Sequence, residues 1–279
     1  MYKGLLAISC FFLLSVRGAA LQQDFSILDR TINGWVDSGY YSGASLIIGK
    51  EGRVIHEKYF GSYGPGTVVY VASAGKWLAA ATIAAVVDEG RLSWDDKVKK
   101  WLPSWTDRKG EATLRQLLSH TAGYPDYQPV GRHPADYSSL KESVSNIAIL
   151  PGDTMAGAIF HYGGLAMQVA GRMAELAAGK DWETLFQEKI ARPLGMSFTH
   201  FTPVDTTQGH NPMLGGGVRT ALRDYSHFLE MISGGGTYRG RRVLSEAAIR
   251  EMQADQVGSA RVAPSASTTS GRSATRRAA

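Results

Sequence analysis

The fold of this chain is decided by the stretch Val68-Val69-Tyr70-Val71-Ala72-Ser73-Ala74-Gly75-Lys76 and by the apolar run that follows it. Residues 68–71 have the pattern of a short buried strand. Residues 77–87 are almost all apolar, which predicts a helix without a polar face in the middle of a domain. Ser73 then lies where the strand meets the positive end of the helix, and Lys76 lies one turn on, on the same face. The pair predicts a nucleophile with a built-in proton acceptor.

The same Ser-x-x-Lys spacing occurs a second time, in Ser138-Ser139-Leu140-Lys141. Ser138 is surrounded by polar residues, which is typical of an ordinary helix start. The strand and the apolar helix around Ser73 therefore favour Ser73 as the nucleophile.

Residues 1–20 have the features of a cleavable secretory signal: Lys3, an apolar stretch over 5–16 and small residues at 18–20. The stretch is short for a membrane span. It contains Cys10, the chain's one cysteine, and its apolar character continues past Cys10, which argues against a lipid anchor. We therefore expect a secreted or periplasmic protein without disulfides or a cysteine nucleophile.

The formal net charge of +5 is concentrated at the two ends of the chain. The body between them is close to neutral, which argues against a nucleic-acid partner. The seven histidines have none of the spacings of a zinc hydrolase. We expect no metal and no organic cofactor, and a monomer.

The remaining pattern predicts a hairpin of strands 44–48 and 54–60, and a short helix over 113–118. Leu165, Val169 and Leu176 indicate one helix, and residues 182–186 belong to another that stops before Pro193. Thr220 and Ser245 are predicted helix N-caps. The tryptophans are predicted to pack in the core rather than line a ligand cleft, and they include Trp94, Trp101 and Trp105.

Several strings, read in chain order, make the chain resemble the serine β-lactamase-like superfamily, which includes class C β-lactamases, D-Ala-D-Ala carboxypeptidases and related esterases. The resemblance covers about residues 25–252. The strings, besides the Ser73 motif, are Glu89-Gly90-Arg91-Leu92-Ser93-Trp94-Asp95-Asp96, Leu117-Leu118-Ser119-His120-Thr121-Ala122-Gly123, Pro193-Leu194-Gly195-Met196 and Gly215-Gly216-Gly217-Val218-Arg219-Thr220 with Asp224.

This resemblance implies an α+β fold (an α/β sandwich), with an antiparallel sheet flanked by helices and an inserted helical subdomain. It also implies acyl-enzyme chemistry on a small-molecule or peptide acyl substrate: a β-lactam, a D-Ala-D-Ala peptide or a short ester. The second motif of the superfamily, Tyr-x-Asn or Tyr-x-Ser, corresponds to Tyr162-Gly163-Gly164. Tyr162 is then the candidate general base beside Lys76, because a phenol next to a cation loses its proton below its usual pKa. Gly164 replaces the polar third residue. His120-Thr121-Ala122-Gly123 is interpreted as a structural turn.

The superfamily's third motif, Lys- or His-x-Gly on a late core strand, has no counterpart in the sequence. Residues 258–279 lack aromatic and acidic residues, so we expect a disordered tail there, and a domain over 21–257 that is incomplete at its C-terminal end through truncation or a frameshift. Loss of one oxyanion donor costs about 10²–10³ in rate. Two functions stay open: a serine hydrolase, or a non-catalytic exported remnant or binding scaffold of the same fold.

Overall fold

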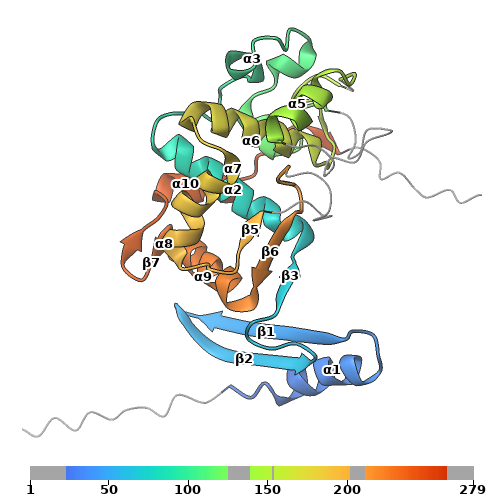
Figure 1. Cartoon of the computed structure of the whole chain (residues 1–279), viewed down its shortest axis with the longest axis vertical. Coiled ribbons are helices and arrows are strands. Elements are labelled where there is room, and N and C mark those ends of the chain that lie inside the picture. The colour runs from blue at the N-terminus through green and yellow to red at the C-terminus, as the bar shows by residue number, and fades with distance from the viewer. Residues whose placement is uncertain (1–22, 125–138, 153, 202–210, 263–279) are drawn as a thin grey trace, which may run out of the picture.

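The computed structural model describes residues 23–124, 139–152, 154–201 and 211–262. Most helices gather in one body, and a long hairpin with helix α1 (Ser26–Asp37) lies at the other end of the molecule (Figure 1). A small sheet lies between the two parts (Figure 1). The mixture of helices and antiparallel strands confirms the predicted α+β class.

The centre of the helical body is formed by α2 (Gly75–Asp88) and α6 (Leu165–Ala178), which pack against each other. Leu78, Ile83 and Val86 of α2 are fully buried, as expected for a helix without a polar face. Each such side chain contributes about 1.5–3 kcal/mol by leaving water. The nucleophile motif therefore begins a helix that is largely buried in the core, as its partner α6 also is.

Other helices surround this pair. They are α3 (Val98–Trp101), α4 (Leu114–Leu118), α5 (Leu140–Ala148), α7 (Trp182–Phe186), α8 (Arg192–Leu194), α9 (Leu222–Ser233) and α10 (Glu246–Gln253). Thr113 caps α4 in a capping box with Gln116, and Ser245 caps α10, as predicted. Ser139 caps α5, and its neighbour Ser138 lies outside the described residues.

The strands of the described residues form separate small sheets instead of one sheet. The predicted hairpin is present as β1 (Gly43–Lys50) and β2 (Arg53–Gly61). A second antiparallel sheet has the order β3 (Val68–Tyr70), β6 (Val218–Ala221) and β5 (His200–Phe201). The two remaining sheets pair β4 (Ile159–Phe160) with β9 (Arg261–Val262) and β7 (Thr237–Tyr238) with β8 (Arg241–Arg242).

Strand β9 lies beyond residue 257, where the sequence placed the end of the domain. Arg261 and Val262 pair in parallel with Ile159 and Phe160, so backbone pairing reaches at least residue 262. The predicted signal at 1–20 and residues 263–279 lie outside the described residues. Within the described ranges, no helix combines the length and apolar character needed to cross a membrane.

Three local predictions were wrong. Thr220 does not cap α9, because it belongs to strand β6 and the cap position is Ala221, without a side-chain bond. Pro193 does not stop the helix before it, because helical structure continues from α7 through a π-helical segment, Gln187–Ala191, into α8, whose first turn contains Pro193. Val68 is partly exposed, so β3 is a strand but not a buried one.

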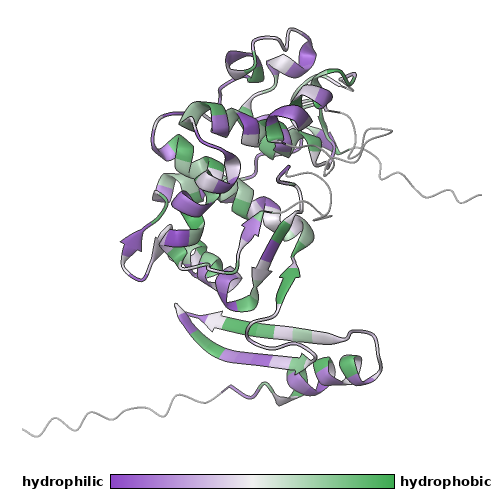
Figure 2. Cartoon of the chain, in the orientation of Figure 1, coloured by the Kyte–Doolittle hydropathy of each residue, from purple (hydrophilic) through white to green (hydrophobic). Residues whose placement is uncertain are grey.

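The three clustered tryptophans agree with their predicted core role: Trp105 is buried, and Trp94 and Trp101 pack partly buried against the core. The hairpin end of the molecule is different. Helix α1 carries both apolar and polar residues (Figure 2). None of its residues is buried, and Ile27 and Trp35 are exposed. The stable core of the described residues is therefore the helical body around α2.

Candidate active site

Ser73 lies in a single 3-10 turn, Ala72–Ala74, between strand β3 and helix α2. The backbone of Val71 extends the strand by donating from its N–H to the carbonyl of Val218, at 3.1 Å. The chain then reverses direction at Ala72, which has a φ of +47°. A non-glycine residue in this left-handed region is strained, and such strain concentrates at functional sites. The turn exposes Ser73 at the start of the buried helix.

Lys76 is directed toward Ser73, as the sequence spacing predicts. Its Nζ donates to Ser73 Oγ at 3.2 Å and to the carbonyl oxygen of Gly215. The amine is therefore held between the nucleophile and the loop that precedes β6. This carbonyl contact was not foreseen, because a backbone acceptor leaves no side-chain signal in a sequence.

Tyr162 completes the group from the loop between β4 and α6. Lys76 Nζ lies 4.7 Å from the centre of the Tyr162 ring. Burial by itself raises the pKa of Tyr162, but hydrogen bonds with Lys76 and Ser73 and the charge of Lys76 outweigh it and bring the pKa below the ordinary value of 10. The structure thus brings together all three predicted residues, Ser73, Lys76 and Tyr162.

The start of α2 is fixed by its neighbours. Gly75 is buried against Val218 of β6, and Tyr225 of α9 donates from its hydroxyl to the carbonyl of Ala74 at 3.1 Å. Gly164 is the N-cap of α6 and contributes no side chain. The site is open to solvent, because Tyr162 is 45% exposed.

The motif around His120 predicts a structural turn, and the structure adds a contact between this residue and the site. Its φ of +59° agrees with the predicted turn after α4. Its ring, however, lies 4.7 Å from the ring of Tyr162. Burial, with a smaller effect of the charge on Lys76, lowers the pKa of His120 to about 4, so the imidazole is neutral at physiological pH. Its place after a helix was visible in the sequence, but its contact across the fold was not.

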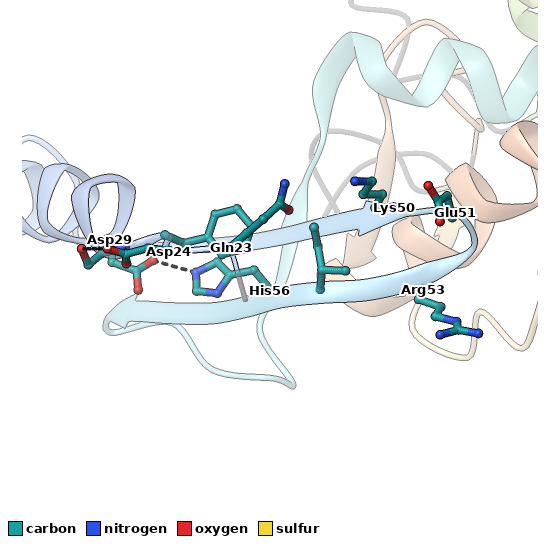
Figure 3. A pocket seen from close by; sticks show the side chains of 10 residues that line it. Gln23, Asp24, Asp29, Lys50, Glu51, Arg53 and His56 are labelled. Carbon is teal, nitrogen blue, oxygen red and sulfur yellow. Dashed lines mark hydrogen bonds and ion pairs between the residues drawn. The ribbon is translucent and has the colours of Figure 1, made fainter. Parts of the chain in front are cut away.

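A hollow lies elsewhere, between the start of α1 and the hairpin, with a volume of about 1140 Å³ (Figure 3). His56 Nε2 and Asp29 Oδ1 lie 2.7 Å apart on its wall (Figure 3). Its lining contains none of the three predicted site residues. Within the part of the chain that the structure describes, no group of three or more His, Cys, Asp or Glu residues could hold a metal ion.

What this geometry allows chemically is acyl transfer. A hydroxyl, an amine and a phenol of lowered pKa share one open site at the positive end of helix α2. A carbonyl carbon placed beside Ser73 Oγ would have its oxygen at this helix end, where the dipole favours developing negative charge.

Known proteins of this type match the chain. In the curated proteins, a "Putative D-alanyl-D-alanine carboxypeptidase" of Escherichia coli (strain K12) is 27% identical over 241 residues, 73% of this chain and 55% of that protein. The D-alanyl-D-alanine-carboxypeptidase/endopeptidase AmpH of the same organism is 29% identical over 171 residues, 53% of this chain and 43% of that protein. The chain thus spans about half the length of the curated relatives that it matches.

A much closer likeness is the crystal structure of a "putative beta-lactamase" from Bacteroides dorei DSM 17855. It is 53% identical, has a TM-score of 0.81, and the match covers 86% of this chain and 72% of that one. The family model for Beta-lactamase matches residues 28–272. With that match over most of its length, the chain belongs to the β-lactamase family, whose members are serine hydrolases of the β-lactamase and D-Ala-D-Ala carboxypeptidase type.

Proposed function

We propose that this protein is a serine hydrolase that forms an acyl-enzyme on Ser73. The observation that carries the proposal is the contact of Lys76 Nζ with Ser73 Oγ at 3.2 Å, with the phenol of Tyr162 hydrogen-bonded to the same two side chains. A hydroxyl is a weak nucleophile by itself and needs an adjacent base. Here the base is the Tyr162 phenolate, stabilised by Lys76.

In the acylation step, Ser73 Oγ forms a bond to the acyl carbon while its proton moves to the phenolate oxygen of Tyr162. The carbonyl oxygen becomes an anion, which the positive end of the α2 dipole stabilises. When the tetrahedral intermediate collapses, the bond to the leaving nitrogen or oxygen breaks, and Tyr162 returns the proton to that atom. The product is an ester of Ser73.

Deacylation repeats the sequence with water. Tyr162 takes one proton from the water molecule, whose oxygen attacks the ester carbon. Collapse breaks the bond to Ser73 Oγ, and Tyr162 protonates that oxygen. The exposure of Tyr162 and Ser73 supports access of water to the ester.

The family acts on small-molecule or peptide acyl substrates. Within that class, the substrates proposed for this chain are β-lactams, D-Ala-D-Ala peptides and short acyl esters, and its relatives named as D-alanyl-D-alanine carboxypeptidases support the peptide. A secreted or periplasmic location, reached through the signal at residues 1–20, suits a protein that meets such peptides. We propose action as a monomer.

One observation favours a second candidate, a non-catalytic exported remnant or scaffold that binds such peptides without turnover. Gly164 provides no side chain to hold Lys76 or the amide of a substrate. Such a protein would retain the fold and the Ser73 turn but would not form the ester.

A covalent probe separates the two candidates. The full chain is incubated with a fluorescent penicillin and, separately, with a fluorophosphonate, and its intact mass is measured. The hydrolase gains one adduct per molecule, which is lost in Ser73→Ala and retained in Ser138→Ala, the serine of the second Ser-x-x-Lys sequence. If folded wild-type protein gains no adduct from either probe, the hydrolase proposal is wrong and the scaffold proposal is supported.

A further inference from the structure

The loop that carries Tyr162 is attached to His120 at two points. The N–H of His161 donates to the backbone carbonyl of His120 at 2.8 Å. The N–H of Gly163 donates to His120 Nδ1, at 3.4 Å. The two bonds lie immediately before and after Tyr162, so that a single residue of the turn after α4 holds both sides of the proposed base.

The imidazole of His120 also packs against the loop. Its ring centre lies 4.7 Å from that of Tyr162, at an interplanar angle of 49°. The ring of Phe160 meets it edge-on from 5.9 Å. Phe160 thus packs against the imidazole, the imidazole packs against the Tyr162 ring, and Lys76 Nζ lies 4.7 Å from the centre of that ring.

From this arrangement we propose that His120, as the neutral tautomer protonated on Nε2, is a positioning residue that holds the Tyr162 phenol against Lys76 and Ser73. This inference rests on the proposed function. The Nδ1 atom must carry no proton, because it accepts from Gly163. Burial and the charge of Lys76 both disfavour the imidazolium form of His120. In that form Nδ1 would carry a proton that faces the N–H of Gly163, and the ring would carry a positive charge near that of Lys76.

The backbone of His120 makes a clean substitution possible. A φ of +59° is tolerated by asparagine and glycine and strained for most other residues. His120→Asn keeps an acceptor near the place of Nδ1, whereas His120→Gly removes the acceptor and the ring. We expect both variants to adopt the turn, so that they differ in whether the N–H of Gly163 finds a side-chain acceptor at position 120.

The first measurement needs no probe. The ionisation of Tyr162 is followed by tyrosinate absorbance, as the difference between each protein and its Tyr162→Phe counterpart. In His120→Gly the pKa moves back toward the ordinary value, because the phenol leaves Lys76; in His120→Asn it stays lowered. An unchanged Tyr162 pKa in His120→Gly, or an equal rise of that pKa in both variants, overturns the proposal.

The second measurement is the rate of acylation by the fluorescent penicillin. His120→Gly lowers it by about 10²-fold, the effect of misplacing a catalytic group by an ångström, and His120→Asn restores most of it. Failure of the proposed function gives a different result. Wild-type protein would then take no label from the penicillin, while the tyrosinate titration would still show whether His120 positions Tyr162.

A third measurement uses the wild type alone. Nitrogen NMR of protein labelled with ¹⁵N-histidine identifies which ring nitrogen of His120 carries the proton, with His120→Asn for assignment. A proton on Nε2 is expected, and a proton on Nδ1 overturns the proposal even where His120→Gly does not fold.

Discussion

A Cβ atom on Gly75 would lie 2.7 Å from Cγ2 of Val218, at the point where helix α2 begins against strand β6. Glycine at position 75 lets the helix approach the sheet closely enough to place Ser73 and Lys76 beside the loop before β6. The close packing of the helix backbone against the Val218 side chain, more than the flexibility of glycine, therefore determines this position.

Gly75→Ala is expected to move the start of α2 away from β6, because the β-branched Val218 side chain is stiff. Overpacking of this kind costs about 1–3 kcal/mol in unfolding free energy, and the displaced Ser73 is acylated more slowly, by about 10²-fold. Denaturant unfolding and probe labelling measure the two effects. Gly34→Ala is the control, because nothing lies within 4 Å of its added Cβ in α1. Wild-type labelling of Gly75→Ala would contradict this account.

Tyr162→Phe removes the proposed base with almost no change in shape. In wild-type protein the labelling rate should rise with pH and level off at a pKa below 10, because the phenolate is the active form. Tyr162→Phe should lose this rise and fall by about 10²–10⁴ in rate, the usual worth of general base catalysis. Tyr40→Phe, at an exposed tyrosine of the hairpin end, is the control. A rise that survives in Tyr162→Phe would assign the base elsewhere.

The same group links stability to pH. The pKa of Tyr162 is lower in the folded state than the ordinary value of 10 expected for the unfolded chain. The unfolded state then binds more protons in the window between the two values, so the contribution of Tyr162 grows as pH rises through it and is lost as pH falls through the folded pKa. The difference in melting temperature between wild type and Tyr162→Phe, followed against pH, should have this sign.

Lys109 is almost fully buried, with 1% of its side chain exposed, whereas its partner Asp107 is 49% exposed. The ammonium lies 2.5 Å from the carboxylate, donates to the carbonyl of Leu150 and lies over the ring of Trp105. Asp107→Asn should destabilise the protein by about 1–2 kcal/mol, less than the loss of a fully buried partner, because water already screens Asp107.

Lys109→Met is the informative companion to that variant. It replaces the buried ammonium with an apolar side chain of similar length and leaves the half-exposed Asp107 carboxylate to water, so the loss of stability should be small. Urea unfolding of the two variants should therefore give a larger loss for Asp107→Asn than for Lys109→Met. The reverse order would mean that the bond of Lys109 to Leu150 is worth more than the ion pair.

The helical core and the nucleophile turn could be predicted because their causes are local. The apolar run after Lys76 has to be buried, and the spacing from Ser73 to Lys76 is one helical turn. The contacts that complete the site are not local. His120 reaches the Tyr162 loop across 43 positions in sequence, and Gly215 accepts from Lys76 across 139. Neither separation leaves a periodic signal.

The failed prediction at Thr220 has a similar cause. Threonine before an amphipathic run is a good N-cap by local rules, but here its hydroxyl lies 2.6 Å from that of Thr199 on the neighbouring segment. A tertiary hydrogen bond replaced the local one, and α9 begins without a side-chain cap. Threonine is favoured both in strands and at helix N-caps, and here the contact with Thr199 accompanies the strand position of Thr220 in β6.

Asp224 of α9 accepts hydrogen bonds from the segment that precedes β5. Its buried carboxylate accepts from the N–H of Phe198 at 2.7 Å and from the hydroxyl of Thr199 at 2.9 Å, and Thr199 in turn bonds Thr220. Asp224→Ala removes the acceptor that these two donors share, and a buried donor left without an acceptor costs about 1–3 kcal/mol. Since β6 also supports the start of α2 through Val218, the labelling of Ser73 should slow as well.

Glu246→Gln, on the exposed face of α10, is the matched control for loss of a carboxylate and should stay within about 0.5 kcal/mol of wild type. Asp224→Asn separates charge from shape: it keeps one oxygen acceptor in place, so its loss should fall between those of Glu246→Gln and Asp224→Ala. Urea unfolding monitored by circular dichroism orders the three variants. An Asp224→Ala protein as stable as Glu246→Gln would mean that β5 and β6 are held by their ladder alone, since the side-chain network would then carry no measurable share of the stability.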